Sequence, residues 1–187
     1  MQIPFNMKFT YGDDMREVPE DATDLLKGIE WLNEELIRVS PVDTLQSAVI
    51  LLNLCVYGRI SGDYRTAQTC GLDALKVFSE YKKSEEAFLT KLRLAQVCHY
   101  QGKFAKANDV YSQALETVEK SKSQQVKKYS EFILFHWGCM KFEQRFYGEA
   151  SSLFARALDE RLILGDIEKI QQAQQAMGRV NDKLLNI

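Results

Sequence analysis

Apolar residues recur along most of the chain at intervals of three and four positions, which is the spacing of one face of an α-helix. A first stripe runs through Leu25, Ile29, Leu32 and Leu36, and later stretches repeat the same spacing. All three prolines lie within the first 41 positions. Because proline disfavours a helix interior by about 3 kcal/mol, its absence from the rest of the chain favours a nearly continuous succession of helices.

The first twelve positions follow a different pattern, in which apolar and polar residues alternate. The apolar members are Ile3, Phe5, Met7, Phe9 and Tyr11. A period of two predicts an extended segment with one apolar face. Since such a face needs covering, we expect it to lie against helices of its own chain or of a second copy in a homodimer. A disordered tail is the alternative.

A short motif occurs three times in the helical part. Each copy has an aromatic residue near a predicted turn, an alanine three positions later, and an Ala-Leu pair seven positions after that alanine. The aromatic residues are Tyr64, Phe104 and Tyr147, and the first alanines are Ala67, Ala107 and Ala150. These alanines lie 40 and then 43 residues apart, a regular period that is typical of a solenoid. The small residues predict close helix packing, and the aromatic residues fill the gap between paired helices.

This motif resembles the tetratricopeptide repeat, and its long period is similar to the extended repeats of kinesin light chains and bacterial peptide-pheromone receptors. Gly138 also stands where that family has the small residue of its first helix. The resemblance implies an all-α fold, a right-handed superhelix of antiparallel helical hairpins. Two departures are Gly71, at a position that is bulky in the other copies, and Arg145, which replaces a turn glycine.

The predicted organisation is an extended arm over residues 1–21 followed by a single helical domain over residues 22–187. Within that domain we predict an N-terminal helix over 22–39, three hairpins over 44–82, 85–121 and 124–163, and a capping helix over 167–185.

Composition adds few constraints on function. The formal net charge is −2, which gives no indication of a nucleic-acid surface. Ten acidic and four basic residues fall within positions 1–44, so the start of the chain is negatively charged relative to the rest. No apolar run approaches the length of a membrane span, no secretory signal is apparent, and the four cysteines are widely spaced. These features predict a cytoplasmic protein without disulfides.

Motifs that carry chemistry are missing from the sequence. The glycines form no phosphate-binding loop, and no histidine–cysteine spacing is typical of a metal site. His136 and Cys139 share a helix face, so a thiolate–imidazole pair is geometrically possible. We predict no cofactor, no metal and no enzymatic activity, with an enzyme using this pair as a further alternative.

The resemblance also implies where a partner binds, because first helices line the inner groove of tetratricopeptide stacks. Val56, Leu92 and Cys139 fall on this groove, beside ten candidate binding residues. Those candidates are Asn53, Arg59, Arg93, Gln96, His99, Phe135, His136, Gln172, Gln175 and Arg179. Arginine and amide side chains supply several hydrogen-bond donors for a peptide backbone or for carboxylates. The alternative is that these residues are ordinary polar positions on helices.

The function that follows is an adaptor or scaffold whose groove binds a protein or peptide. The alternative is a regulatory sensor of a short peptide that acts through a partner protein, since no DNA-binding helix-turn-helix is recognisable.

Overall fold

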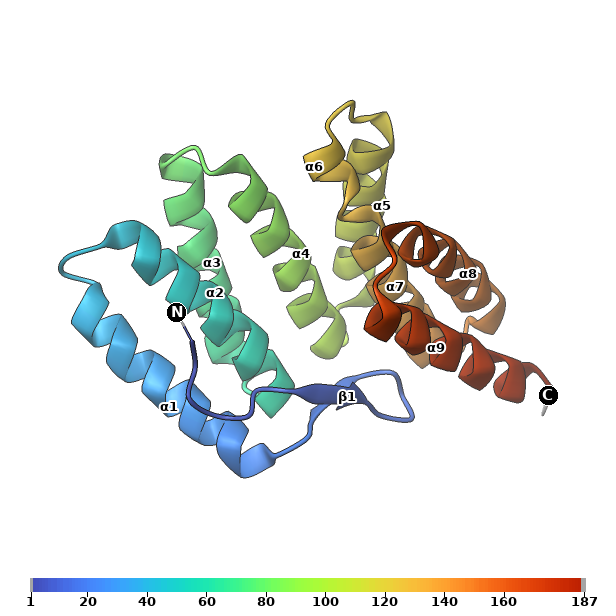
Figure 1. Cartoon of the computed structure of the whole chain (residues 1–187), viewed down its shortest axis with the longest axis horizontal. Coiled ribbons are helices and arrows are strands. Elements are labelled where there is room, and N and C mark those ends of the chain that lie inside the picture. Colours follow the sequence, from blue (N-terminus) through green and yellow to red (C-terminus); the bar gives the residue numbers. More distant parts are fainter. Residues whose placement is uncertain (1, 186–187) are drawn as a thin grey trace. The chain divides into compact units, whose positions relative to one another are not determined.

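The computed structural model describes residues 2–185, which form helices preceded by a short two-stranded hairpin (Figure 1). The helices follow one another in packed pairs, so the all-α class predicted from the sequence is confirmed. None of the described helices combines the length and hydrophobicity that a bilayer crossing requires. The strands are β1 (Phe9–Tyr11) and β2 (Glu17–Pro19), and the helices are α1 (Ala22–Val39), α2 (Thr44–Ser61), α3 (Tyr64–Glu80), α4 (Ser84–Tyr100), α5 (Phe104–Lys120), α6 (Gln124–Lys127), α7 (Ser130–Glu143), α8 (Tyr147–Leu164) and α9 (Ile167–Leu185).

The chain forms two compact units. Unit 1 comprises the residues up to Gly12 together with Glu17–Lys106, and unit 2 comprises Asp13–Arg16 together with the residues from Ala107 onward. The predicted division into an arm over 1–21 and a single domain over 22–187 stays a prediction. Each unit is treated by itself below.

Aspartates begin α1, α2 and α3. The side chains of Asp21, Asp43 and Asp63 accept hydrogen bonds from backbone N–H groups in the first turns of these helices. Those N–H groups have no partner within the helix, and an aspartate cap of this kind stabilises a helix by about 1 kcal/mol. The side-chain and backbone hydrogen bonds from Thr66 also lower the pKa of Asp63. The starts of these three helices are therefore encoded locally.

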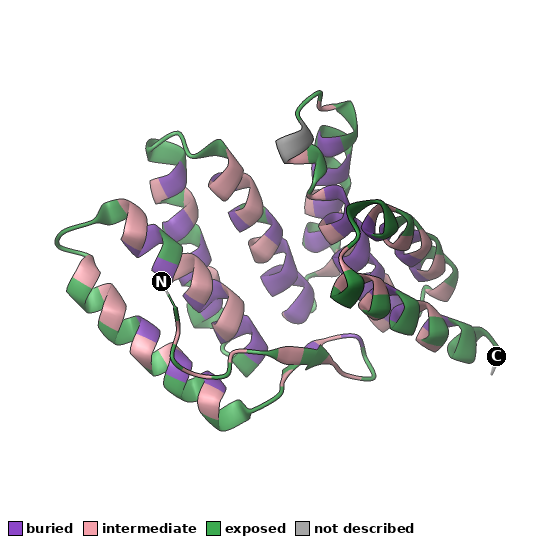
Figure 2. Cartoon of the chain, in the orientation of Figure 1, coloured by how far each residue is buried: buried purple, intermediate pink, exposed green. Residues whose placement is uncertain are grey.

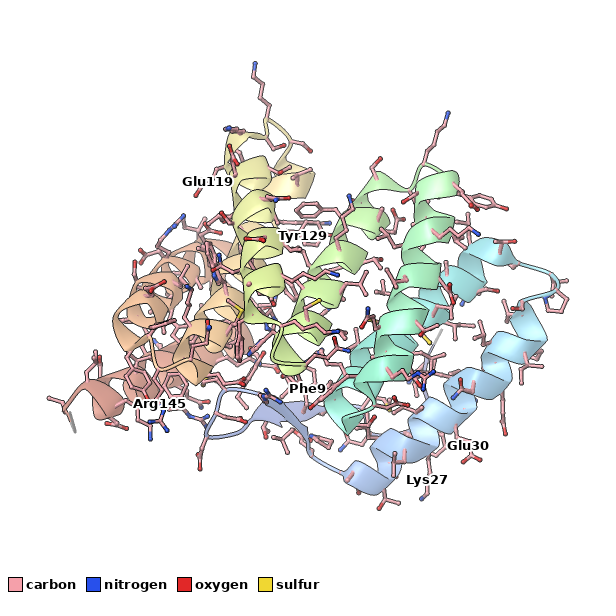
Figure 3. The ribbon with its side chains drawn as sticks, turned by 180° about the vertical axis from the view of Figure 1, so that it is seen from behind. Phe9, Lys27, Glu30, Glu119, Tyr129 and Arg145 are labelled. Atoms are coloured by element: carbon pink, nitrogen blue, oxygen red, sulfur yellow. The ribbon has the colours of Figure 1, made fainter. Side chains whose placement is uncertain are left out.

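The turns inside the three hairpins use the left-handed backbone region. Gly62 has a φ of 91° and Gly102 a φ of 72°. Arg145, which lies at the turn between α7 and α8, adopts a φ of 65° without being glycine (Figure 3). A non-glycine residue in this region costs on the order of 1–3 kcal/mol. The sequence departure at Arg145 therefore leaves the turn geometry intact at a modest energetic cost.

Small residues allow the paired helices to approach closely. Ala67, Ala107 and Ala150 are fully buried. In unit 2, a Cβ added at Gly138 of α7 would lie 2.7 Å from the Phe154 ring of α8. The two helices can pack at this distance only because position 138 has no side chain.

Gly71 is explained by the helix that follows it. A Cβ at this position of α3 would lie 2.7 Å from Leu94 Cδ2 and 2.8 Å from Cys55 Sγ. Tyr111 and Phe154, which are bulky and buried, occupy the corresponding place in the other two copies. Leu94 of α4 thus fills the space beside position 71 that Tyr111 and Phe154 fill in the other two copies.

The beginning of the chain is extended, as its alternating pattern predicts. From Ile3 to Tyr11 the odd-numbered side chains are partly buried and the even-numbered ones are exposed (Figure 2). The segment continues into β1, which pairs antiparallel with β2 in a register that sets Phe9 opposite Pro19 and Tyr11 opposite Glu17. The return strand β2 has no counterpart in the sequence-based prediction. Residues 2–12 and 17–20 are called the arm below.

Two glycine substitutions test the packing of the hairpins. Gly138→Ala should lower the melting temperature, because overpacking against Phe154 costs about 1–3 kcal/mol. Gly178→Ala is the matched control: it lies inside α9 with no atom within 4 Å of the added Cβ, so it should raise stability by up to about 1 kcal/mol through helix propensity. Thermal unfolding followed by circular dichroism measures both. Equal shifts in the two variants would contradict the packing described here.

Candidate functional site

The arm lies against α1 and α2 of unit 1, and its β2 strand also contacts Tyr100 at the end of α4 (Figure 1). This surface is called the first-helix face below. Ile3 packs against the buried cluster that includes Leu32 and Leu54. Met7 packs against Gly28 of α1 so closely that a Cβ added at position 28 would overlap the methionine sulfur. The backbone N–H of Asn6 donates to Asp24 at 3.2 Å. The apolar side of the arm is therefore covered by its own chain.

A buried ion pair joins the arm to α2. Arg59 Nη2 donates to Glu17 Oε2, and both side chains are almost completely excluded from solvent. Tyr100 at the end of α4 contacts both partners, since its hydroxyl accepts the Glu17 backbone N–H at 2.6 Å and its ring lies 4.5 Å below the Arg59 guanidinium. Isolated buried charges are very costly, so this pair fixes the position of β2 on the first-helix face.

Arg93 of α4 brings a second guanidinium to the same place. Burial lowers the pKa of Arg93, the negative charge of Glu17 opposes that shift, and the positive charge of Arg59 adds to it. Arg93 also donates to Gln96 Oε1 at 3.0 Å. Among the described residues, Glu17 Oε1 accepts no hydrogen bond. The charges of Glu17 and Arg59 thus both act on the half-buried Arg93.

The other unit 1 candidates lie at different depths. Residues 95–100 at the end of α4 are all buried, including Gln96 and His99 (Figure 2). The His99 ring packs against Tyr100 at 5.2 Å and Phe104 at 6.0 Å between centroids. Asn53 is partly exposed. In this arrangement Arg59, Gln96 and His99 offer no open surface, and a role for them in partner binding stays a prediction.

In unit 2 the candidates divide between core and surface. Phe135 is buried beneath the Arg161 guanidinium, which lies 4.0 Å from its ring centroid, and His136 is buried against Phe132 at 4.3 Å. The three candidates on α9 are accessible: Gln175 is exposed, and Gln172 and Arg179 are partly exposed. Of the unit 2 candidates, only those on α9 offer side chains that a partner could contact directly.

The described residues offer little basis for catalysis. His136 and Cys139 are both buried, which leaves them no access to a substrate in solution. Burial raises the pKa of the Cys55 thiol to about 12, so it stays protonated near neutral pH. Within residues 2–185, no group of three or more histidine, cysteine or acidic side chains could hold a metal ion.

Sequence reasoning missed Glu17 and Tyr100. Glu17 is one of several acidic residues near the start of the chain, where no single carboxylate stands out. The available signal was Gly12-Asp-Asp14, since glycine and aspartate after an alternating run are typical of a hairpin turn. A return strand starting near Glu17 could have been predicted from it.

Comparison with known proteins agrees with this architecture. Residues 46–120, which extend from α2 to the end of α5, match the tetratricopeptide repeat family. Among solved structures, the chain is similar to BtubC (BKLC) from P. vanneervenii with a TM-score of 0.57 and 19% identity, over 88% of this chain and 76% of that one. An identity this low shows the fold alone. None of the curated proteins matches the sequence.

The match over residues 46–120 confirms the resemblance to the tetratricopeptide repeat that the sequence motifs indicated. Repeats of this family are in general protein-interaction modules and in general not enzymes.

The buried ion pair can be tested through stability. Arg59→Met keeps most of the side-chain volume but leaves the Glu17 carboxylate without its closest cation. Breaking a buried pair in this way costs about 3–5 kcal/mol, so the melting temperature should fall markedly. Arg38→Met, at an exposed pair with Glu35, should leave the melting temperature nearly unchanged. A normal melting temperature for Arg59→Met would mean that the pair does not anchor the arm.

Proposed function

We propose that this protein is an adaptor that binds an extended segment of a partner protein on the first-helix face of unit 1. The observation that carries the proposal is the arm, which occupies this face in extended form with its odd-numbered side chains inward. Met7 of the arm packs against Gly28, and Glu17 of the arm pairs with Arg59. A surface that fits one extended segment can fit another of similar chemistry.

The arm then competes with the partner for binding to the first-helix face. A tethered segment has an effective concentration of roughly millimolar when its linker is short, so it opposes ligands that bind the same face from solution. A partner must therefore match the contacts of the arm or bind while the arm is displaced. The arm of a second copy could make the same contacts with Gly28 and Arg59, and we propose that a homodimer would form in this way.

Several further features belong to this proposal. The accessible α9 residues Gln172, Gln175 and Arg179 are candidates for additional partner contacts in unit 2. The cysteines Cys55, Cys70, Cys98 and Cys139 are all free and buried, which agrees with a reducing cytoplasm and with a binding function instead of thiol catalysis. The first-helix face also suits the alternative of a sensor for a short peptide that acts through a partner protein.

A variant of the full chain tests the proposal. In Ile3→Asp/Met7→Asp/Glu17→Gln, called the opened variant, two charges replace inward apolar side chains and the carboxylate that pairs with Arg59 is removed, so the arm should dissociate from the first-helix face. The probe is a fluorescent synthetic peptide with the sequence of residues 2–20. Its affinity, measured by fluorescence anisotropy, should be at least tenfold higher for the opened variant than for the unmodified chain.

The matched control is Gln2→Asp/Thr10→Asp, which adds the same two charges on the exposed side of the arm. This control should bind the probe no better than the unmodified chain. An opened variant that keeps its helical circular dichroism and yet does not bind the peptide would contradict the proposal.

A further inference from the structure

The turn between β1 and β2 belongs to unit 2 and contacts helices of that unit. It comprises Asp13–Arg16, and its Met15 side chain is buried. Arg179 of α9 donates to the Met15 sulfur at 3.6 Å. Connecting turns normally lie in solvent, so a buried methionine at this place means that unit 2 holds the turn in a fixed position.

Arg16 of this turn pairs with Glu143, the last residue of α7, through two parallel hydrogen bonds. Its Nε donates to Oε2 at 2.9 Å, and its Nη2 donates to Oε1 at 2.6 Å. Asp14 helps to orient the arginine, since it accepts the Arg16 backbone N–H at 2.9 Å. Only 25% of the Arg16 side chain and 18% of the Glu143 side chain are exposed. A planar guanidinium makes this bidentate contact, whereas the ammonium group of lysine does not.

Each side of this contact carries a local cost. Glu143 places a negative charge at the C-terminal end of α7, where the helix dipole is itself negative. Met15 has a φ of 64°, in the left-handed region that non-glycine residues avoid. Strained residues of this kind persist where surrounding contacts hold them, and they are frequent at binding sites. The charge of Arg16 and the burial of Met15 offset these two costs, so the end of α7 and the turn fit each other.

We propose that the end of α7, together with Arg179 of α9, is an interaction site of unit 2 that recognises a turn in which a large apolar residue is followed by arginine. This site is called the turn site below. The turn Asp13–Arg16 is its resident ligand, and a partner protein that presents the same pair of residues in a turn replaces it. The turn site consists of other residues than the first-helix face, so this inference does not depend on the function proposed above.

The two residues of the recognised pair contribute differently. The apolar side chain supplies affinity, because its burial removes apolar surface from water. The arginine supplies specificity, because its two parallel donors match the Glu143 carboxylate in one orientation. A lysine at the same position would keep the charge and lose the second hydrogen bond.

A chain whose own turn no longer fits the turn site tests this recognition. In Met15→Gly/Arg16→Ser, called the vacated variant, the apolar side chain and the cation are removed, and glycine adopts the φ of the turn without strain. The probe is a fluorescent cyclic peptide that carries residues 10–18 and is closed through two glycines, since Thr10 and Val18 are paired in the hairpin. Its affinity, measured by fluorescence anisotropy, should be at least tenfold higher for the vacated variant than for the unmodified chain.

Two further peptides separate recognition of arginine from a general attraction between charges. Arg16→Lys in the peptide should weaken binding at least fivefold although the charge is kept, and Val18→Thr, at an exposed position, should change it less than twofold. Equal affinities of the parent and Arg16→Lys peptides would overturn the inference. It would also be overturned if the vacated variant kept its helical circular dichroism and bound no peptide. Either result leaves the proposed function standing, because this peptide lacks Ile3 and Met7.

A last pair of variants assigns the effect to Glu143. In the vacated chain, Glu143→Gln should reduce the affinity ratio between the parent and Arg16→Lys peptides at least threefold, because an amide has only one acceptor oxygen for the guanidinium. Glu149→Gln is the matched control, since it removes a carboxylate of the same unit that pairs with Lys141 instead, and it should leave the ratio unchanged. A ratio that Glu143→Gln does not change would mean that the peptide binds away from the turn site, and the inference would fail.

Discussion

The buried ion pair between Arg59 and Glu17 is the interaction on which the arrangement of unit 1 depends. Removing either charge from water costs several kcal/mol, and that cost is offset only while the two groups remain in contact. Glu17 and Arg59 are 42 residues apart in the sequence, so their side chains can be buried together only when the arm packs against α2. Tyr100 contacts both residues, since its ring stacks on Arg59 and its hydroxyl accepts the backbone N–H of Glu17.

Unit 2 contains a comparable buried pair that is built differently. Glu131 of α7 accepts hydrogen bonds from Arg161 of α8 at 2.8 Å and from Lys169 of α9 at 2.7 Å. Both the acid and the bases therefore come from helices of the same unit. In unit 1 the helices supply two arginines and the arm supplies the acid. The buried pair of unit 1 therefore joins the arm to a helix, whereas the pair of unit 2 joins helices only.

The sequence alone predicted the features that local periodicity encodes. The helical hairpins follow from apolar spacing, and the inward side of the arm follows from the alternation between Ile3 and Tyr11. It could not predict that Gln96 and His99 are buried, because the burial of a polar side chain depends on neighbours far along the chain. Glu17 was missed for the same reason, since its partner Arg59 is distant in sequence and several other acidic residues stand near it.

Hydrogen exchange of the arm tests most directly whether the first-helix face is occupied by its own chain. Amides in residues 6–19, followed by mass spectrometry at several protein concentrations, would report this contact. The account predicts that the Glu17 amide and the paired amides of β1 and β2 exchange much more slowly than in the isolated peptide, at a rate independent of protein concentration. Exchange at the rate of the free peptide would contradict the account, as would protection that appears only as the concentration rises.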